Sequence, residues 1–166
     1  MRFVTHSADE TEALGERLAK TLHGGEIIAE GTIDEFVDLD TLTRESDIIS
    51  LNCPLNDSTR GMFDFGRIAM MKKTAILINV ARGPVVDSRA LADALNSGHL
   101  AAAAADVFEM EPPIPREHPL LNAKNCLVTP HIAFASEESM LRRAEIVFDN
   151  LYAFLHGEQK NVILPR

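Results

Sequence analysis

The chain has 166 residues, of which 46% are hydrophobic and 25% charged, and its formal net charge is -9 at pH 7. This composition is ordinary for one globular domain and excludes the disordered, collagen-like and coiled-coil classes. Because an acidic surface without a basic patch repels phosphate, we expect neither nucleic acid nor an anionic membrane as a partner.

Short apolar runs alternate along the chain with segments of helical period. This alternation predicts a parallel sheet with helices on both faces, which is a Rossmann-like, doubly wound α/β/α fold in a single domain. The predicted strands are residues 2–5, 26–29, 36–38, 47–52, 74–80, 102–108 and 126–129.

Three helices are predicted from their end signals and apolar spacing. Ser7 is a natural N-cap for the first, and Asp87 can cap a second that ends at Gly98. Apolar residues recur at helical spacing over 136–156, which predicts a long amphipathic third helix. The alanines 101–105 directly follow a glycine-terminated helix, so we interpret them as a strand crowded by neighbouring backbone.

The two cysteines, Cys53 and Cys126, lie in or at the end of apolar, strand-like runs, without CxxC or Cys/His spacing. This placement favours free buried thiols over a disulfide or a metal site. The sequence also has no run of about 18 apolar residues and no basic-then-apolar leader. We therefore expect a cytoplasmic protein that binds no metal.

Three polar residues follow predicted strands, where open parallel sheets bind their ligands. They are Arg82, Glu111 and His131. An arginine can clamp a carboxylate, a histidine can move a proton, and a carboxylate can favour the protonated histidine, which together suit a 2-hydroxy or 2-keto acid. Taken singly, each residue could instead have no catalytic role: Arg82 as a surface arginine, Glu111 as a solvated loop acid and His131 as a loop histidine.

Four stretches of sequence contain these three residues or precede them. They are Asp-Ile-Ile-Ser-Leu-Asn-Cys-Pro-Leu at 47–55, Ile-Asn-Val-Ala-Arg-Gly-Pro-Val-Val-Asp at 78–87, Asp-Val-Phe-Glu-Met-Glu-Pro at 106–112 and Thr-Pro-His-Ile at 129–132. In order and spacing they closely resemble the D-isomer-specific 2-hydroxy acid dehydrogenases. The resemblance covers residues 35–163 and implies the NAD-binding domain of that family.

The resemblance also implies roles for individual residues. Arg82 would bind the substrate carboxylate and polarise its carbonyl, His131 would be the acid/base, and Glu111 would support His131. Asp106 would hold the nicotinamide amide. The residues implied to line the cofactor side are Thr59, Asn79 and Ala81. Phe134 departs from the family pattern, and its ring could crowd the nicotinamide.

The sequence lacks the glycine-rich loop that a dinucleotide site needs between the first strand and the first helix. The corresponding turn, residues 5–10, has no glycine and has carboxylates at Asp9 and Glu10, which repel phosphate. Glu30 could hold an adenine ribose, although an exposed acid is the simpler interpretation. We therefore expect no cofactor, or NAD bound no tighter than about millimolar if the degraded site still binds it.

Residues 1–29 look foreign to the dehydrogenase. They resemble the start of the small P-loop ATPases that help make threonylcarbamoyladenosine on tRNA, but the strand at Ile27 continues into 30–34 rather than into a P-loop. This predicts a β-α-β unit of foreign origin at 1–29 joined near Ala29 to a dehydrogenase-derived part at 30–166. Both parts would belong to one Rossmann-like domain.

Three hypotheses for function remain. The first is an engineered chimera, a P-loop ATPase fragment fused to a dehydrogenase relic, with no natural catalytic activity. The second is a truncated NAD-dependent D-2-hydroxy acid dehydrogenase, and the third is a non-enzymatic binding module. A monomer or a homodimer is expected, and apolar surface around residues 62–71 would favour the dimer.

Overall fold

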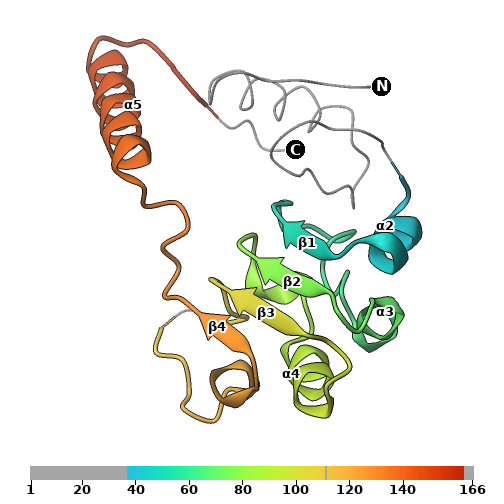
Figure 1. The fold of residues 1–166 in the computed structure, drawn as a ribbon. Helices are drawn as coiled ribbons and strands as arrows, with labels where there is room; N and C mark the ends of the chain where they lie inside the picture. Colours follow the sequence, from blue (N-terminus) through green and yellow to red (C-terminus); the bar gives the residue numbers. More distant parts are fainter. Residues whose placement is uncertain (1–36, 111, 163–166) are drawn as a thin grey trace. The chain divides into compact units, whose positions relative to one another are not determined.

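Four strands form one parallel sheet in the computed structural model, which describes residues 37–110 and 112–162 (Figure 1). The sheet has the order β1-β2-β3-β4, with β1 (Ile48–Leu51), β2 (Ile76–Asn79), β3 (Ala102–Ala105) and β4 (Cys126–Val128). The parallel α/β fold predicted from the sequence is confirmed, and so is the strand assignment of the alanine run.

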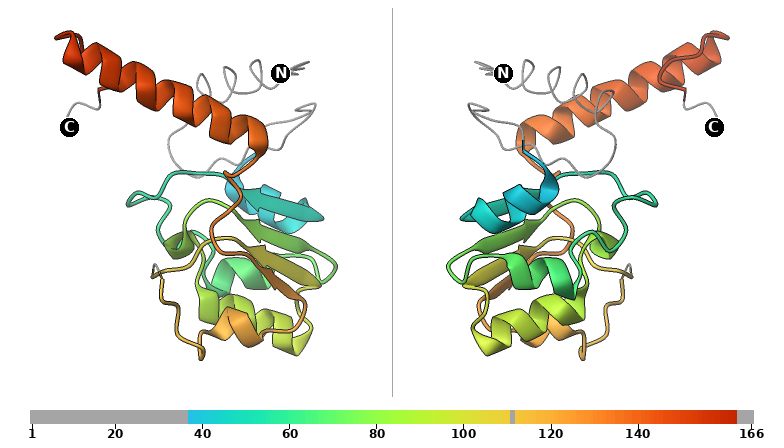
Figure 2. Two further views of the ribbon diagram at one scale, coloured as in Figure 1. Left: turned by 90° about the vertical axis from the view of Figure 1, so that its left-hand side faces the viewer. Right: turned by 90° about the vertical axis from the view of Figure 1, so that its right-hand side faces the viewer.

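The connections between successive strands place their helices on one side of the sheet (Figure 1, Figure 2). After β1 comes α3 (Phe65–Met70), after β2 comes α4 (Ser88–Ser97), and after β3 comes the 3-10 helix η2 (Pro119–Asn122). Parallel strands are joined by crossovers of one hand, so helices between strands in sequential order share a face. The helix predicted after Ser7 and the strands predicted at 2–5 and 26–29 lie outside the described residues.

The strands bury the side chains that face these helices. Ile49, Leu51 and Leu77 are at most 1% exposed, and Ala103 is 3% exposed. Side chains alternate between the two faces of a strand, and on the opposite face Ile48 is 61% exposed. The helical face of the sheet therefore provides the core that holds the strand ends in register.

The two predicted helices in the described part begin and end where their capping residues indicate. Asp87 caps α4 by accepting the backbone N–H groups of Arg89 and Ala90, and Gly98 ends it in the left-handed conformation with φ 73°. In the second of two compact units, Ile132–Arg166, α5 (Glu137–Leu155) follows the N-cap Ser136.

Two sequence-based interpretations are wrong. Of the strand expected at 36–38, residue 36 lies outside the described residues, and residues 37 and 38 are not a strand but lead into a helix: the Asp38 carboxylate caps α2 (Leu39–Glu45) by accepting the N–H groups of Asp40 and Thr41. Residues 62–71 were expected to expose apolar surface, but most of their large side chains belong to the core. Those at most 8% exposed are Met62, Phe63, Ile68 and Met71.

Among the helices of the described part of the chain, none is long and apolar enough to cross a membrane. Within the same residues, no group of three or more His, Cys, Asp or Glu side chains could hold a metal ion. Cys53 and Cys126 are free and half-buried, and burial raises the pKa of both thiols.

Candidate active site

The polar residues singled out in the sequence follow consecutive strands at one edge of the sheet. Arg82 follows β2, Asp106 follows β3 and His131 follows β4. Because all strands are parallel, their carboxyl ends meet at this edge, which we call the carboxyl edge. This is the edge at which open α/β sheets bind ligands.

Asn79 shapes the turn that presents Arg82. Its side chain is buried, donates from Nδ2 to the Arg82 carbonyl at 3.1 Å, and accepts the Ala81 N–H at 3.1 Å. The exposed Arg82 guanidinium donates to the Ala81 carbonyl at 2.7 Å. Asn79 and Ala81, both expected on the cofactor side, are thus buried parts of the turn that holds the arginine.

Gly83 brings the turn after β2 into direct contact with the segment after β3. A Cβ atom at this position would lie 1.9 Å from the Phe108 carbonyl carbon and 2.3 Å from the Glu109 nitrogen, whereas real Cβ atoms keep at least 3.0 Å. Only glycine fits this backbone-to-backbone approach. Gly83 was not among the site residues expected from the sequence, although its place directly after Arg82 was an available signal.

Asp106 joins the ends of three strands. It is 4% exposed, its N–H donates to the Asn79 carbonyl at 3.0 Å, and its carboxylate accepts the Thr129 hydroxyl. The Thr129 N–H in turn donates to the Ala105 carbonyl at 3.1 Å. The Asp106 carboxylate and backbone therefore tie together the carboxyl ends of β2, β3 and β4.

His131 follows β4 with an uncommon backbone conformation. Its φ is 57°, in the left-handed region, and it is half-buried. Histidine tolerates this region better than most residues, and such strained conformations concentrate at functional sites. Its expected partner Glu111 lies outside the described residues, as does Glu30.

Thr59, also expected on the cofactor side, organises the loop after β1. It is 1% exposed, donates its hydroxyl hydrogen to the Pro54 carbonyl at 2.7 Å, and accepts the Asn56 N–H at 2.9 Å. The Asn56 carboxamide oxygen accepts the backbone N–H of Ser58 at 2.9 Å. These bonds use the Thr59 hydroxyl to hold the loop.

A hydrogen-bonded pair of side chains that was not expected from the sequence, His118 and Glu109, braces the segment that follows β3. His118 is 8% exposed, and its Nε2 lies 3.0 Å from Glu109 Oε2, while its Nδ1 accepts the Leu120 N–H. Burial would raise the pKa of Glu109, but hydrogen bonds from Ser88 and His118 outweigh it and leave that pKa below its usual value. Glu109 thus connects the first residue of α4, Ser88, to His118, the N-cap of η2.

Comparisons with known proteins agree with this geometry. Residues 16–133 match the family model described as the D-isomer specific 2-hydroxyacid dehydrogenase, NAD binding domain. The chain is 52% identical over 132 residues to a glyoxylate reductase of Thermofilum pendens, and 47% identical over 128 residues to a hydroxypyruvate reductase of Blautia hydrogenotrophica. These alignments cover 80% and 77% of this chain but 39% of each relative, so the chain spans about two fifths of their length.

Solved structures are similar to the same part of the chain. A D-isomer specific 2-hydroxyacid dehydrogenase of Lactobacillus delbrueckii, in an NAD complexed form, has a TM-score of 0.68 and 32% sequence identity. The similarity covers 78% of this chain and 43% of that one. Both the strand order and the sequence at the carboxyl edge are therefore accounted for by one family.

The comparisons also bear on the first 29 residues. The family match begins at residue 16, inside the segment interpreted as foreign. They support the dehydrogenase resemblance and provide no support for a P-loop ATPase fragment or for a junction near Ala29. The comparisons thus favour the alternative interpretation, a truncated NAD-dependent D-2-hydroxy acid dehydrogenase, over the engineered chimera.

Proposed function

The chain belongs to the D-isomer specific 2-hydroxyacid dehydrogenase family through its NAD-binding domain, and from this premise we propose that it provides the nicotinamide-binding and proton-transfer half of such an enzyme. The observation that supports the proposal most directly is the placement of Arg82, Asp106 and His131 after consecutive parallel strands. The substrate class is a small 2-keto acid or 2-hydroxy acid. Glyoxylate and hydroxypyruvate are suggested by the names of similar proteins.

The carboxyl edge offers the acceptor that a nicotinamide needs. Asp106 is 4% exposed, and its carboxylate accepts the Thr129 hydroxyl where β4 ends. A carboxamide N–H of the cofactor would donate to this carboxylate, which is the role that the family resemblance implies for Asp106. When bound there, NADH would supply a hydride to C2 of the keto acid.

Side chains of the protein bind the substrate and transfer the proton. The Arg82 guanidinium pairs with the substrate carboxylate and polarises the C2 carbonyl, because a planar guanidinium matches a carboxylate in two parallel hydrogen bonds. His131 in its protonated form donates a proton to the C2 oxygen as C2 is reduced, and takes that proton back in the oxidation direction. Glu111 would favour the protonated histidine.

Binding of the pyrophosphate is expected to be weak, because none of the nine glycines is arranged as Gly-x-Gly-x-x-Gly. The proposal is therefore tested with nicotinamide mononucleotide, which lacks the adenine half. We expect saturable NMR shifts at the backbone N–H groups of residues 81, 106 and 129, and their loss in Asp106→Ala. Asp57→Asn, in the loop after β1, is the matched control that keeps the shifts.

Turnover provides the second measurement. NADH oxidation by the chain with glyoxylate should fall by at least about 100-fold in both Arg82→Ala and His131→Ala, as is typical when an acid/base or a carboxylate clamp is removed. Glyoxylate reduction that survives both substitutions would contradict the assigned roles. Binding of nicotinamide mononucleotide without shifts at the carboxyl edge would contradict the location.

A further inference from the structure

The peptide bond between Phe108 and Glu109 is where the segment after β3 touches the Arg82 turn. Gly83 directly follows Arg82, is buried, and approaches this peptide so closely that no methyl group would fit between them. The same turn is held from within by the Asn79 amide, which donates to the Arg82 carbonyl. Because closely packed groups transmit displacement, the position of this peptide influences the turn that presents the arginine.

The imidazole of His118 contacts the side chains of both residues that flank this peptide. Its Nε2 lies 3.0 Å from Glu109 Oε2. Its ring meets the Phe108 ring edge-on, with 5.1 Å between the ring centroids and 90° between the ring planes. His118 is 8% exposed, so one buried ring holds the two residues whose backbone meets Gly83.

The hydrogen bonds of His118 indicate which ring nitrogen carries the hydrogen. Nδ1 lies 3.3 Å from the Leu120 backbone nitrogen and accepts its N–H as the N-cap of η2. A ring nitrogen that accepts a hydrogen bond carries no hydrogen, so the hydrogen of the neutral imidazole is on Nε2 and points at the Glu109 carboxylate. An imidazole protonated on both nitrogens would direct a second N–H at that of Leu120. The neutral Nε2–H tautomer satisfies both contacts.

The Glu109 carboxylate has a second anchor besides His118. Ser88, the first residue of α4, is 5% exposed and forms a side-chain hydrogen bond to this carboxylate. Glu109 is therefore held by two buried side chains from different elements. Capping η2 requires Nδ1 of His118 alone, so the bond from Nε2 to Glu109 and the contact with Phe108 are additional to the cap.

We propose that His118 is a positioning residue for Arg82. It acts through the Glu109 carboxylate, which holds the Phe108–Glu109 peptide against Gly83. This rests on the proposed function, in which Arg82 binds the substrate carboxylate. Without the Nε2 bond the carboxylate turns to solvent, the peptide relaxes, and the guanidinium loses the fixed geometry that two parallel hydrogen bonds to a carboxylate require.

His118→Asn separates positioning from capping, because asparagine is a favoured N-cap but is too short to reach Glu109. We expect the Arg82 Nε–H resonance of the unliganded chain to shift, and kcat/KM for glyoxylate with NADH to fall about 5- to 20-fold. Glu109→Ala should have the same effects. Glu109→Gln, which still accepts a hydrogen bond, should stay within about threefold of the wild type. Glu117→Gln, at an exposed glutamate next to His118, is the control that changes neither quantity.

A double-mutant cycle distinguishes positioning of Arg82 from a general loosening of the fold. In the Arg82→Ala background, His118→Asn should lower kcat/KM by less than about twofold, because no guanidinium is left to position. An equal fall in both backgrounds would overturn the proposal. So would an Arg82 resonance that does not move in His118→Asn.

The ¹⁵N resonances of the His118 imidazole test the tautomer directly. At pH 7 we expect a protonated Nε2 and a bare Nδ1, and an Nδ1–H tautomer or an imidazolium would overturn the proposal. These spectra and the Arg82 resonance need no turnover. They decide the proposal even for a chain that does not reduce glyoxylate, a result that would contradict the proposed function instead. If His118→Asn does not fold, the tautomer and the comparison of Glu109→Ala with Glu109→Gln decide.

Discussion

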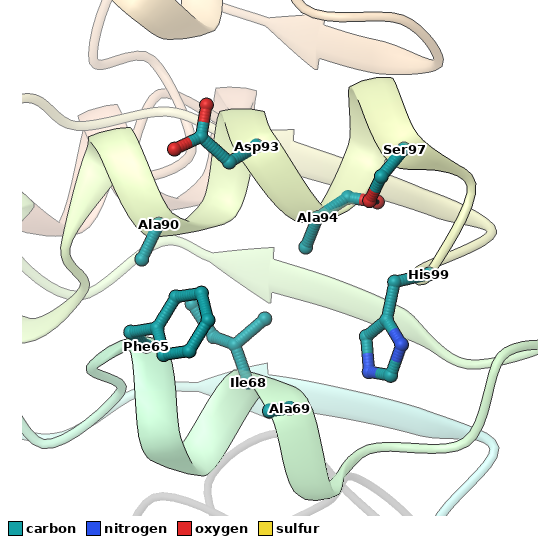
Figure 3. Close-up of a pocket in the computed structure, with 8 residues that line it drawn as sticks. All are labelled: Phe65, Ile68, Ala69, Ala90, Asp93, Ala94, Ser97 and His99. Atoms are coloured by element: carbon teal, nitrogen blue, oxygen red, sulfur yellow. Dashed lines mark hydrogen bonds between the residues drawn. The ribbon is translucent and has the colours of Figure 1, made fainter.

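The carboxyl edge and a pocket of about 330 Å³ between α3 and α4 (Figure 3) belong to the same sheet and helices, but they differ in how closely their atoms are packed. At the edge, the buried Asn79 and Asp106 have hydrogen-bond partners in neighbouring turns and strands, and Gly83 leaves no room even for a methyl group. In the pocket, Ala69 of α3 and Ala90 and Ala94 of α4 leave the space between the two helices open. The edge is thus closely packed with its polar groups paired, whereas the space between the two helices is not filled by side chains.

This difference predicts that the same kind of substitution has opposite effects in the two regions. At the edge, any added atom or lost polar partner disturbs contacts that are already made. Beside α3, where space is open, an added apolar atom should not lower the free energy of unfolding. Three substitutions test this comparison, from the largest expected effect to the smallest.

Gly83→Ala should destabilise the protein most, by at least about 3 kcal/mol, because the new methyl group must displace the Phe108 backbone rather than a flexible side chain. The measurement is the free energy of unfolding in urea. Gly66→Ala is the matched control, since its Cβ would meet only Asp64 Oδ1 at 3.4 Å, and alanine in a helix should stabilise by about 0.5–1 kcal/mol. Equal effects of the two substitutions would refute the comparison.

Asn79→Ala should cost about 2 kcal/mol, because it removes both hydrogen bonds that hold the turn between β2 and Arg82 and leaves buried groups unpaired. The same substitution at the exposed Asn52, whose amide donates only to the Ser50 hydroxyl, should stay within about 0.5 kcal/mol. Urea unfolding of both variants measures the difference. A cost at Asn79 no larger than that at Asn52 would mean that the turn does not need the buried amide.

Glu109→Gln should have the smallest effect, less than about 1 kcal/mol at pH 7, because the carboxylate is 37% exposed and partly screened by solvent. The folded-state pKa of Glu109 lies below its usual value, so the charged form stabilises the fold above the unfolded-state pKa. That contribution is lost as the pH falls through the folded-state pKa. The stability difference between wild type and Glu109→Gln should therefore shrink from pH 7 towards pH 3.

The control for this titration is Glu117→Gln, an exposed glutamate on the same segment. Its unfolding free energy should follow that of the wild type at every pH between 3 and 7, to within about 0.5 kcal/mol. A gap between wild type and Glu109→Gln that is constant with pH would show that Glu109 contributes through packing rather than through charge.

Local sequence signals predicted some elements well and failed at others for identifiable reasons. Asp87 and Gly98 bound α4 correctly, because a side-chain cap and a left-handed glycine are decided within a few residues. The prediction of a strand at 36–38 was wrong because Asp38 is the N-cap of a helix that begins at the next residue, Leu39. The apolar character of 62–71 was visible, but whether those side chains face the core or solvent depends on what α3 packs against.

The candidate site divides in the same way. Arg82, Asp106 and His131 could be identified because strand ends and the family resemblance mark them along the chain. Gly83 and the pair of Glu109 and His118 could not, since their importance comes from contacts between separate segments.

The sequence by itself determined the family, the parallel sheet and the order in which Arg82, Asp106 and His131 follow its strands, because hydrophobic period, caps and motif spacing are local properties. Tertiary structure alone decided that the Asn79 amide donates to the Arg82 carbonyl and that the backbone of Gly83 touches Phe108. It also decided that alanines on two helices border a pocket beside His99. Each of these depends on which surfaces face one another across the fold. Packing of distant segments sets that arrangement, and no window of the sequence contains it.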